Sequence, residues 1–148
     1  MPNFSEIPWI AEHIELYRTD PEKARLWDST AVGGPGLLPT LLLTTTGRKS
    51  GQPRALPLIY GEAGKSYVVV ASKGGMPTHP IWFSNLEAEP RCELMVGAKK
   101  VAARARIAEG EESARLWKQM AAIYPPYDAY QKNATPRVIP VVVLDPVG

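Results

Sequence analysis

Three cations stand close together in the segment LLLTTTGRKSGQPRALPLIY, which runs from Leu41 to Tyr60. Arg48, Lys49 and Arg54 lie there between two apolar runs, with two glycines and no acid. Arginine binds phosphate or carboxylate through a planar fork, lysine acts as a point charge, and glycine lets backbone N–H groups approach an anion. The segment therefore predicts either an anion-binding loop or a solvated turn whose charges aid solubility.

A second candidate is the segment 71–75, which reads ASKGG and joins an expected strand to an expected helix. In that position, backbone N–H groups and the positive end of a helix dipole can face an anionic ligand. Lys73 adds a charge and Ser72 a hydroxyl. Ordinary strand-to-helix loops share this composition, so the segment alone does not separate a binding loop from a simple connection.

Aromatic residues supply two more candidates. Trp82 falls on an expected helix, where tryptophan belongs to the core more often than to a ligand site. His79, near the helix start, is either a pocket residue or a polar residue whose hydrogen bonds are satisfied within the protein. Tyr124, Tyr127 and Tyr130 recur every third residue and would share one face of a short helix. Phenols have a pKa of about 10 and are neutral donors at neutral pH. The tyrosines therefore predict either a packing stripe or the wall of a substrate pocket.

Several kinds of chemistry lack the residues they need. The single cysteine, Cys92, permits no internal disulfide, and with two histidines there is no Cys/His zinc spacing. No serine or cysteine nucleophile has an acid–base partner, and neither a Gly-x-Gly-x-x-Gly after a strand nor a Walker loop occurs. The net charge of +2 gives no global field for nucleic acid. We therefore expect no metal, no hydrolase chemistry and no nucleic-acid partner.

The N-terminal part predicts two helices. Residues 6–18 are amphipathic, and their acids disfavour peripheral contact with anionic lipid, so we expect this helix to pack on the domain or on a second subunit. Asp20 and Pro21 are typical of the start of a second helix, which we expect to run to about Asp28. No basic region followed by an apolar run opens the sequence, so we expect no signal peptide and a cytoplasmic location.

The rest of the chain predicts strands with helices between them. The expected strands are 40–46, 54–61, 66–71, 91–96, 99–108 and 138–144, the expected helices are 78–88 and 111–123, and residues 31–39 are an expected loop. Pro57 suggests an edge position or a bulge, and the apolar strand 138–144 is expected to be central. Helix 111–123 is expected to bury Ala114, Trp117, Met120 and Ala121. About six mostly antiparallel strands favour an α+β antiparallel barrel, as one domain over 1–148 with 1–30 as a helical extension.

Four ordered motifs between residues 37 and 145 resemble one family. They read TTGRKSGQxR, ASKGG, HPxWxxNL and YPxYxxY. Together they resemble the deazaflavin-dependent nitroreductase family of actinobacteria, whose members have a split β-barrel fold and use coenzyme F420, a deazaflavin with a phosphate and an oligoglutamate tail. The resemblance implies an F420H2-dependent reductase that passes a hydride to a small electron-poor acceptor, such as an enone, a quinone or a nitroaromatic.

The resemblance also implies residue roles. The implied cofactor-binding residues are Arg48, Lys49, Arg54, Pro57, Ala71, Ser72, Lys73, Gly74, His79 and Trp82, and the implied catalytic residues are Tyr124, Tyr127, Tyr130 and Ser72. A homodimer is plausible, since split barrels of this superfamily often pair. Two alternatives stay open: an enzyme that uses flavin mononucleotide on the same barrel, and a non-catalytic F420-binding protein.

Overall fold

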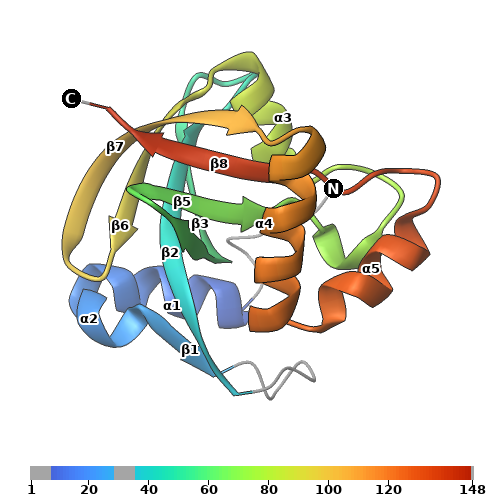
Figure 1. The fold of residues 1–148 in the computed structure, drawn as a ribbon. Helices are drawn as coiled ribbons and strands as arrows, with labels where there is room; N and C mark the ends of the chain where they lie inside the picture. Colours follow the sequence, from blue (N-terminus) through green and yellow to red (C-terminus); the bar gives the residue numbers. More distant parts are fainter. Residues whose placement is uncertain (1–7, 29–35, 148) are drawn as a thin grey trace.

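One curled antiparallel sheet organises the chain (Figure 1). The computed structural model describes residues 8–28 and 36–147. Within them the strands are β1 (Leu26–Asp28), β2 (Leu37–Thr46), β3 (Pro53–Ile59), β4 (Gly61–Ala63), β5 (Ser66–Val70), β6 (Arg91–Val96), β7 (Lys99–Ile107) and β8 (Val141–Pro146). Their order is β1-β2-β6-β7-β8-β5-β4, with β3 paired to β2. Every pairing is antiparallel, which confirms the predicted fold class.

The helices lie around this sheet (Figure 1). They are α1 (Pro8–Thr19), α2 (Pro21–Ala24), the short 3-10 helix η3 (Lys73–Gly75), α3 (Ile81–Ala88), α4 (Gly110–Ile123) and α5 (Pro126–Ala134). Helix α3 begins at Ile81 rather than at the predicted Thr78, because Pro80 takes the N-cap position. The expected strand 54–61 is divided into β3 and β4.

The sheet separates two apolar cores. Along β5, Val69 belongs to one core, whereas Val68 and Val70 belong to the other, because successive side chains of a strand point to opposite faces. The second core lies under α4 and α5. Strand β8 lies between β7 and β5, and residues 141–144 are buried, which confirms the predicted central position.

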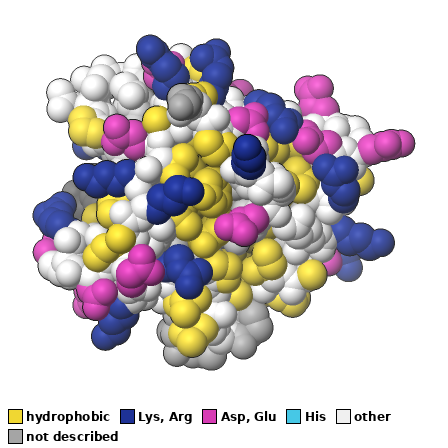
Figure 2. Space-filling model, turned by 60° about the vertical axis from the view of Figure 1, so that its left-hand side comes forward, with side chains coloured by type: hydrophobic (Ala, Val, Ile, Leu, Met, Phe, Trp, Pro, Cys, Tyr) yellow, Lys and Arg dark blue, Asp and Glu magenta, His cyan; other side chains and the backbone are white. Residues whose placement is uncertain are grey.

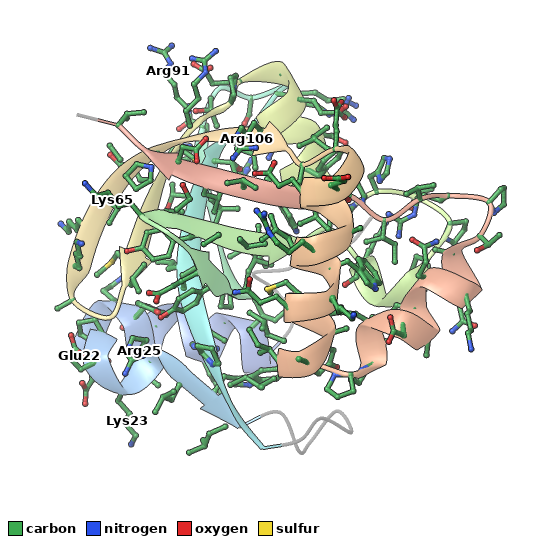
Figure 3. All side chains as sticks on the ribbon, viewed as in Figure 1. Glu22, Lys23, Arg25, Lys65, Arg91 and Arg106 are labelled. Atoms are coloured by element: carbon green, nitrogen blue, oxygen red, sulfur yellow. The ribbon has the colours of Figure 1, made fainter. Side chains whose placement is uncertain are left out.

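Helix α4 confirms its predicted extent but corrects its predicted face. Leu116 and Met120 are its buried residues, whereas Ala114 is exposed and Trp117 and Ala121 are only partly buried. Leu116 and Met120 are four residues apart, so they lie above one another on the helix surface that meets the sheet. Arg106 of β7, labelled in Figure 3, forms ion pairs with Glu112 of α4 and Asp145 of β8.

The predicted second helix is wrong beyond its first turn. Asp20 and Pro21 start α2 as expected, with the Asp20 carboxylate accepting from the Lys23 amide, but the helix ends at Ala24. Leu26–Asp28 instead forms β1, which pairs with Leu37–Pro39 of β2. The predicted loop is therefore also wrong at residues 37–39, while its residues 31–35 lie outside the described ranges. Glu22 fixes α2 on the β6–β7 hairpin by accepting from the Ala98 amide at 3.0 Å (Figure 3).

Strand β3 is an edge strand, because β2 is its only partner among the described strands. Pro57 lies within it, as the sequence predicted for an edge position. The outer side of β3 is therefore available to form the walls of cavities rather than to continue the sheet.

Candidate active site

Two cavities lie along β3, one beside each half of the strand. The first has a volume of about 540 Å³ and is lined by the basic loop 47–50, by residues 53–56, and by Ile81, Trp82 and Asn85 of α3. The second has a volume of about 290 Å³ and is lined by residues 57–59 together with the three tyrosines and Ser72. The structure thus brings the predicted loop, tryptophan and tyrosines to one strand, although they are far apart in the sequence.

Asn85 fixes the basic loop of the first cavity. This side chain is only 2% exposed. Its Oδ1 accepts from the Arg48 backbone N–H at 3.1 Å, and its Nδ2 donates to the Thr45 hydroxyl at 3.2 Å. Sequence reasoning assigned Asn85 no role, since an asparagine on a helix gives no signal of a partner far away in the chain.

The cations of this loop are exposed. Within the described part of the chain, Arg48, Lys49 and Arg54 take part in none of the ion pairs. Gly47 makes the tight turn possible, because a Cβ atom there would lie 2.6 Å from Ser50 Oγ. Three unopposed positive charges on a fixed turn form a site suited to a phosphate or a carboxylate.

The three tyrosines of the second cavity form one aromatic cluster. Ring centroids are 4.9 Å apart for Tyr124 and Tyr127, 6.0 Å for Tyr124 and Tyr130, and 6.3 Å for Tyr127 and Tyr130. The hydroxyls of Tyr124 and Tyr130 are hydrogen-bonded at 2.9 Å. Burial, and then the Tyr130 hydroxyl, raise the pKa of Tyr124, and burial likewise raises the pKa of Tyr127. These phenols are therefore neutral and can donate hydrogen bonds to a bound molecule.

Arg137 holds the loop that carries Ser72. Its Nη1 donates to the Ala71 carbonyl at 3.1 Å, its Nη2 to the Ser72 carbonyl at 2.8 Å, and its Nε to the Met76 carbonyl at 3.0 Å. Its Nη1 also lies 3.0 Å from Nδ1 of His79. A guanidinium can only donate, so this His79 nitrogen accepts. Burial, and then the Arg137 charge, lower the pKa of His79.

The same loop has an unusual backbone. Lys73 has a φ of +48° and Gly75 a φ of +82°, both in the left-handed region. The Lys73 ammonium donates to the Thr78 hydroxyl at 3.0 Å. Gly75 lies against α5, so this loop directly contacts the helix that carries Tyr127 and Tyr130, whereas Tyr124 is the C-cap residue of α4.

The predicted cofactor-binding residues fall into three groups. Arg48, Lys49, Arg54 and Trp82 line the first cavity, Pro57 and Ser72 line the second, and Ala71, Lys73, Gly74 and His79 belong to the adjoining segment and line neither of these two cavities. His79 packs on Phe83 with ring centroids 4.8 Å apart. His79 therefore helps to position the loop through Arg137 rather than forming a cavity wall.

Helix α1 contributes to both cavities. Ile14 lines the first cavity, and its neighbour His13 lines the second. We expected this helix to pack on the domain or on a second subunit, and the contacts of α1 with β3 show packing on the domain. Neither His13 nor Arg137 was predicted, because each partner lies far away in the sequence.

The fold occurs in distant proteins. A structure described as a pyridoxamine 5'-phosphate oxidase from Listeria innocua superposes with a TM-score of 0.54 at 15% identity, covering 74% of this chain and 84% of its own. This likeness concerns the fold alone. The curled antiparallel sheet, with a cavity lined by cations beside one lined by tyrosines along its edge strand, defines the protein as a split-barrel protein.

Closer relatives define the family. The model of the F420H(2)-dependent quinone reductase family matches residues 16–146. An F420H(2)-dependent quinone reductase of Mycobacterium tuberculosis is 42% identical over 146 residues, covering 92% of this chain and 95% of the relative. The solved structure of an F420-H2 dependent reductase is 44% identical with a TM-score of 0.67, covering 72% of this chain and 93% of its own. This chain belongs to the F420H(2)-dependent quinone reductase family.

Family membership confirms the predicted class and cofactor. The protein is an oxidoreductase that depends on coenzyme F420, and its fold is the predicted split barrel. The family also favours coenzyme F420 over flavin mononucleotide, and an enzyme over a non-catalytic carrier. None of the helices in residues 8–28 and 36–147 is long and apolar enough to cross a membrane.

Proposed function

We propose that the enzyme reduces a quinone, with the coenzyme tail in the first cavity and the quinone in the second. The observation that carries this proposal is that both cavities share β3, with residues 53–56 in one and 57–59 in the other. Reduced F420, when bound, supplies the hydride. The protein needs only to hold the two reactants within roughly 3–3.5 Å of each other and in line.

The residues of the first cavity fit an anionic coenzyme. The unopposed charges of Arg48, Lys49 and Arg54 suit the phosphate and the glutamate tail, and Trp82 offers an apolar surface. Asn85 keeps the Arg48 amide in place, so the loop is organised before the coenzyme arrives. Ser72 and the 71–75 segment, held by Arg137, lie beside the second cavity and would border the deazaflavin ring.

The residues of the second cavity fit the acceptor. A quinone takes up one hydride and one proton to become a hydroquinone, and the hydride alone leaves a negative charge on oxygen. The hydroxyls of Tyr124 and Tyr130 hold two protons, of which one lies between them, so the other can be donated to that oxygen. Ser72 offers a further hydroxyl at the same cavity.

The oligomeric state is proposed from a relative. A solved structure of a domain-swapped dimer is 38% identical to this chain with a TM-score of 0.68, covering 93% of this chain and 98% of its own. A homodimer of this chain is tested by light scattering of the eluted protein. Figure 2 shows lysine and arginine side chains dispersed among acidic and apolar ones on one face. The cytoplasmic location, the single-domain assignment over 1–148 and the low membrane affinity stay predictions from the sequence.

The function is tested in one series of titrations. The purified protein is titrated with F420 and, in parallel, with flavin mononucleotide, and binding is followed by fluorescence. Reduced F420 and menadione are then added, and oxidation of the coenzyme is recorded. We expect preferential F420 binding and menadione-dependent oxidation, whereas F420 binding without oxidation by any quinone would contradict the proposed acceptor.

A further inference from the structure

The second cavity contains an imidazole besides its hydroxyls. His13 of α1 lines this cavity together with Ser72 and the tyrosines, although it is only 6% exposed. Its ring stacks on Tyr17 with centroids 5.8 Å apart and an interplanar angle of 14°, so the orientation of the ring is fixed.

Hydrogen bonding determines which His13 nitrogen carries the proton. Nε2 lies 2.7 Å from the carbonyl oxygen of Ala24, which can only accept, so Nε2 carries a proton and donates it. The Thr40 hydroxyl lies 3.2 Å from the same nitrogen and also donates to the Ala24 carbonyl, at 2.8 Å. Burial lowers the pKa of His13, so the ring is neutral at neutral pH. In the neutral ring the other nitrogen, Nδ1, therefore has a lone pair and acts as an acceptor.

Nδ1 of His13 faces accessible space. Both hydrogen bonds of the ring within residues 8–28 and 36–147 involve Nε2. Among the same residues, no side-chain nitrogen or oxygen that is fully buried lacks a hydrogen-bond partner. Nδ1 is therefore not fully buried, and the cavity that His13 lines is the second one.

We propose that Nδ1 of His13 accepts a hydrogen bond from a hydroxyl of the bound acceptor, so that the enzyme prefers hydroxylated quinones to unsubstituted ones. This inference rests on the proposed function of the cavity. The tyrosine hydroxyls donate, and a quinone carbonyl satisfies them. His13 Nδ1 accepts, and only an acceptor that also bears an O–H group satisfies it. A site built to bind a hydroxyl discriminates against an analogue that lacks it, because the polar group of the protein then stays unpaired.

His13 is thus a specificity determinant rather than a proton donor. The neutral ring holds its single proton on Nε2, against Ala24, so Nδ1 has none to give to the acceptor. Proton donation in the cavity is left to the tyrosine and serine hydroxyls, and the contribution of His13 is expected mainly in KM.

Two variants separate the cavity role of His13 from its structural role. In His13→Gln, the amide nitrogen can take the place of Nε2 and donate to Ala24, but nothing replaces Nδ1. In His13→Asn, the amide oxygen lies close to the Nδ1 position, but the side chain is too short to reach Ala24. Thermal melts establish that each variant is folded. If His13→Asn does not fold, His13→Gln, which keeps the hydrogen bond to Ala24, is enough to test the role of Nδ1.

The substrates are menadione and a panel in which one hydroxyl is moved around the menadione skeleton. For the wild type, kcat/KM of the best hydroxylated member should exceed that of menadione by about tenfold, mostly through KM. His13→Gln should lower kcat/KM of the hydroxylated member to about that of menadione, and His13→Asn should keep the preference. Quenching of protein fluorescence by the same compounds gives the comparison without turnover. The inference is overturned if the wild type shows no preference for hydroxylated quinones or if His13→Gln retains that preference. If the protein binds the hydroxylated compounds selectively but does not turn over menadione, only the proposed function is contradicted.

Discussion

Gly75 lies directly against the backbone of Tyr130. A Cβ atom on Gly75 would stand 2.8 Å from the Tyr130 carbonyl oxygen and 2.9 Å from its Cα atom. The loop that carries Ser72 and the helix that carries Tyr127 and Tyr130 are therefore set at a distance that only glycine permits.

Gly75→Ala should consequently displace Tyr130 and lower turnover. We expect the variant to lose about 1 kcal/mol or more of stability, since its φ of +82° also disfavours a side chain. We expect a fall in kcat/KM for menadione that exceeds any change in F420 affinity. The control is Gly64→Ala, where φ is +62° but no atom lies within 4 Å of the added methyl. This variant therefore strains the backbone without displacing a neighbouring residue. Equal turnover of the two variants would contradict the coupling of loop and helix.

Removing the charges of the basic loop should weaken coenzyme binding. Arg48→Ala combined with Lys49→Ala removes two charge-assisted contacts, each worth about 1.5–3 kcal/mol, so F420 affinity should fall at least about tenfold. The loss should shrink at high salt, because screening weakens the wild type more than the variant. Lys99→Ala with Lys100→Ala, at exposed positions of β7 outside the first cavity, is the matched control. A folded loop variant with wild-type affinity would exclude this groove as the anion site.

Removing one phenol should slow the reaction more than it weakens coenzyme binding. Tyr124→Phe breaks the hydroxyl pair with Tyr130 and removes a donor from the second cavity. Loss of one donor to a developing oxyanion typically costs about a hundredfold, and a neighbouring hydroxyl can replace part of it, so we expect roughly a tenfold to hundredfold lower kcat. Tyr67→Phe, in the other core, is the control. If Tyr124→Phe keeps wild-type kcat on several quinones, the tyrosines serve packing alone.

Stability should fall as the solution becomes acidic. Burial, and then Arg137, lower the pKa of His79 in the folded protein below the ordinary value of 6.5. Below pH 6.5 the unfolded chain therefore binds a proton that the folded protein excludes, and the free energy of unfolding decreases as pH drops toward the folded-state pKa. Urea unfolding at a series of pH values measures this slope. His79→Asn keeps an acceptor for Arg137 without titrating, so its slope should be smaller.

The elements that depend on local sequence could be predicted. The β6–β7 hairpin was placed correctly because Gly97 and Ala98 separate two strand patterns, and Gly97 has the φ of +58° that favours glycine. The prediction that the three tyrosines share one helix face is only partly right: Tyr127 and Tyr130 lie on α5, whereas Tyr124 is the C-cap residue of α4, so the cluster forms across the junction of two helices. The basic loop was recognised because its charges have no acids beside them in the sequence.

The contacts that could not be predicted join distant parts of the chain. Strand β1 has three residues and exists through its pairing with β2, a partner that a local pattern cannot reveal. Asn85 meets the basic loop 37 residues away, and Arg137 meets the Ser72 carbonyl 65 residues away. The buried face of α4 was predicted only in part, with Met120 right and Leu116 missed, since the sheet decides which side of that helix is covered.

Helix α1 places two consecutive residues in two different cavities, Ile14 in the first and His13 in the second. If the coenzyme and the acceptor occupy these cavities as proposed, both binding equilibria depend on the free energy of holding this helix in place. A coenzyme that fixes α1 lowers the ordering cost met by the acceptor, and linkage requires the acceptor to change coenzyme affinity by the same factor. The proposed sites would then be coupled through the N-terminal helix, which contacts both.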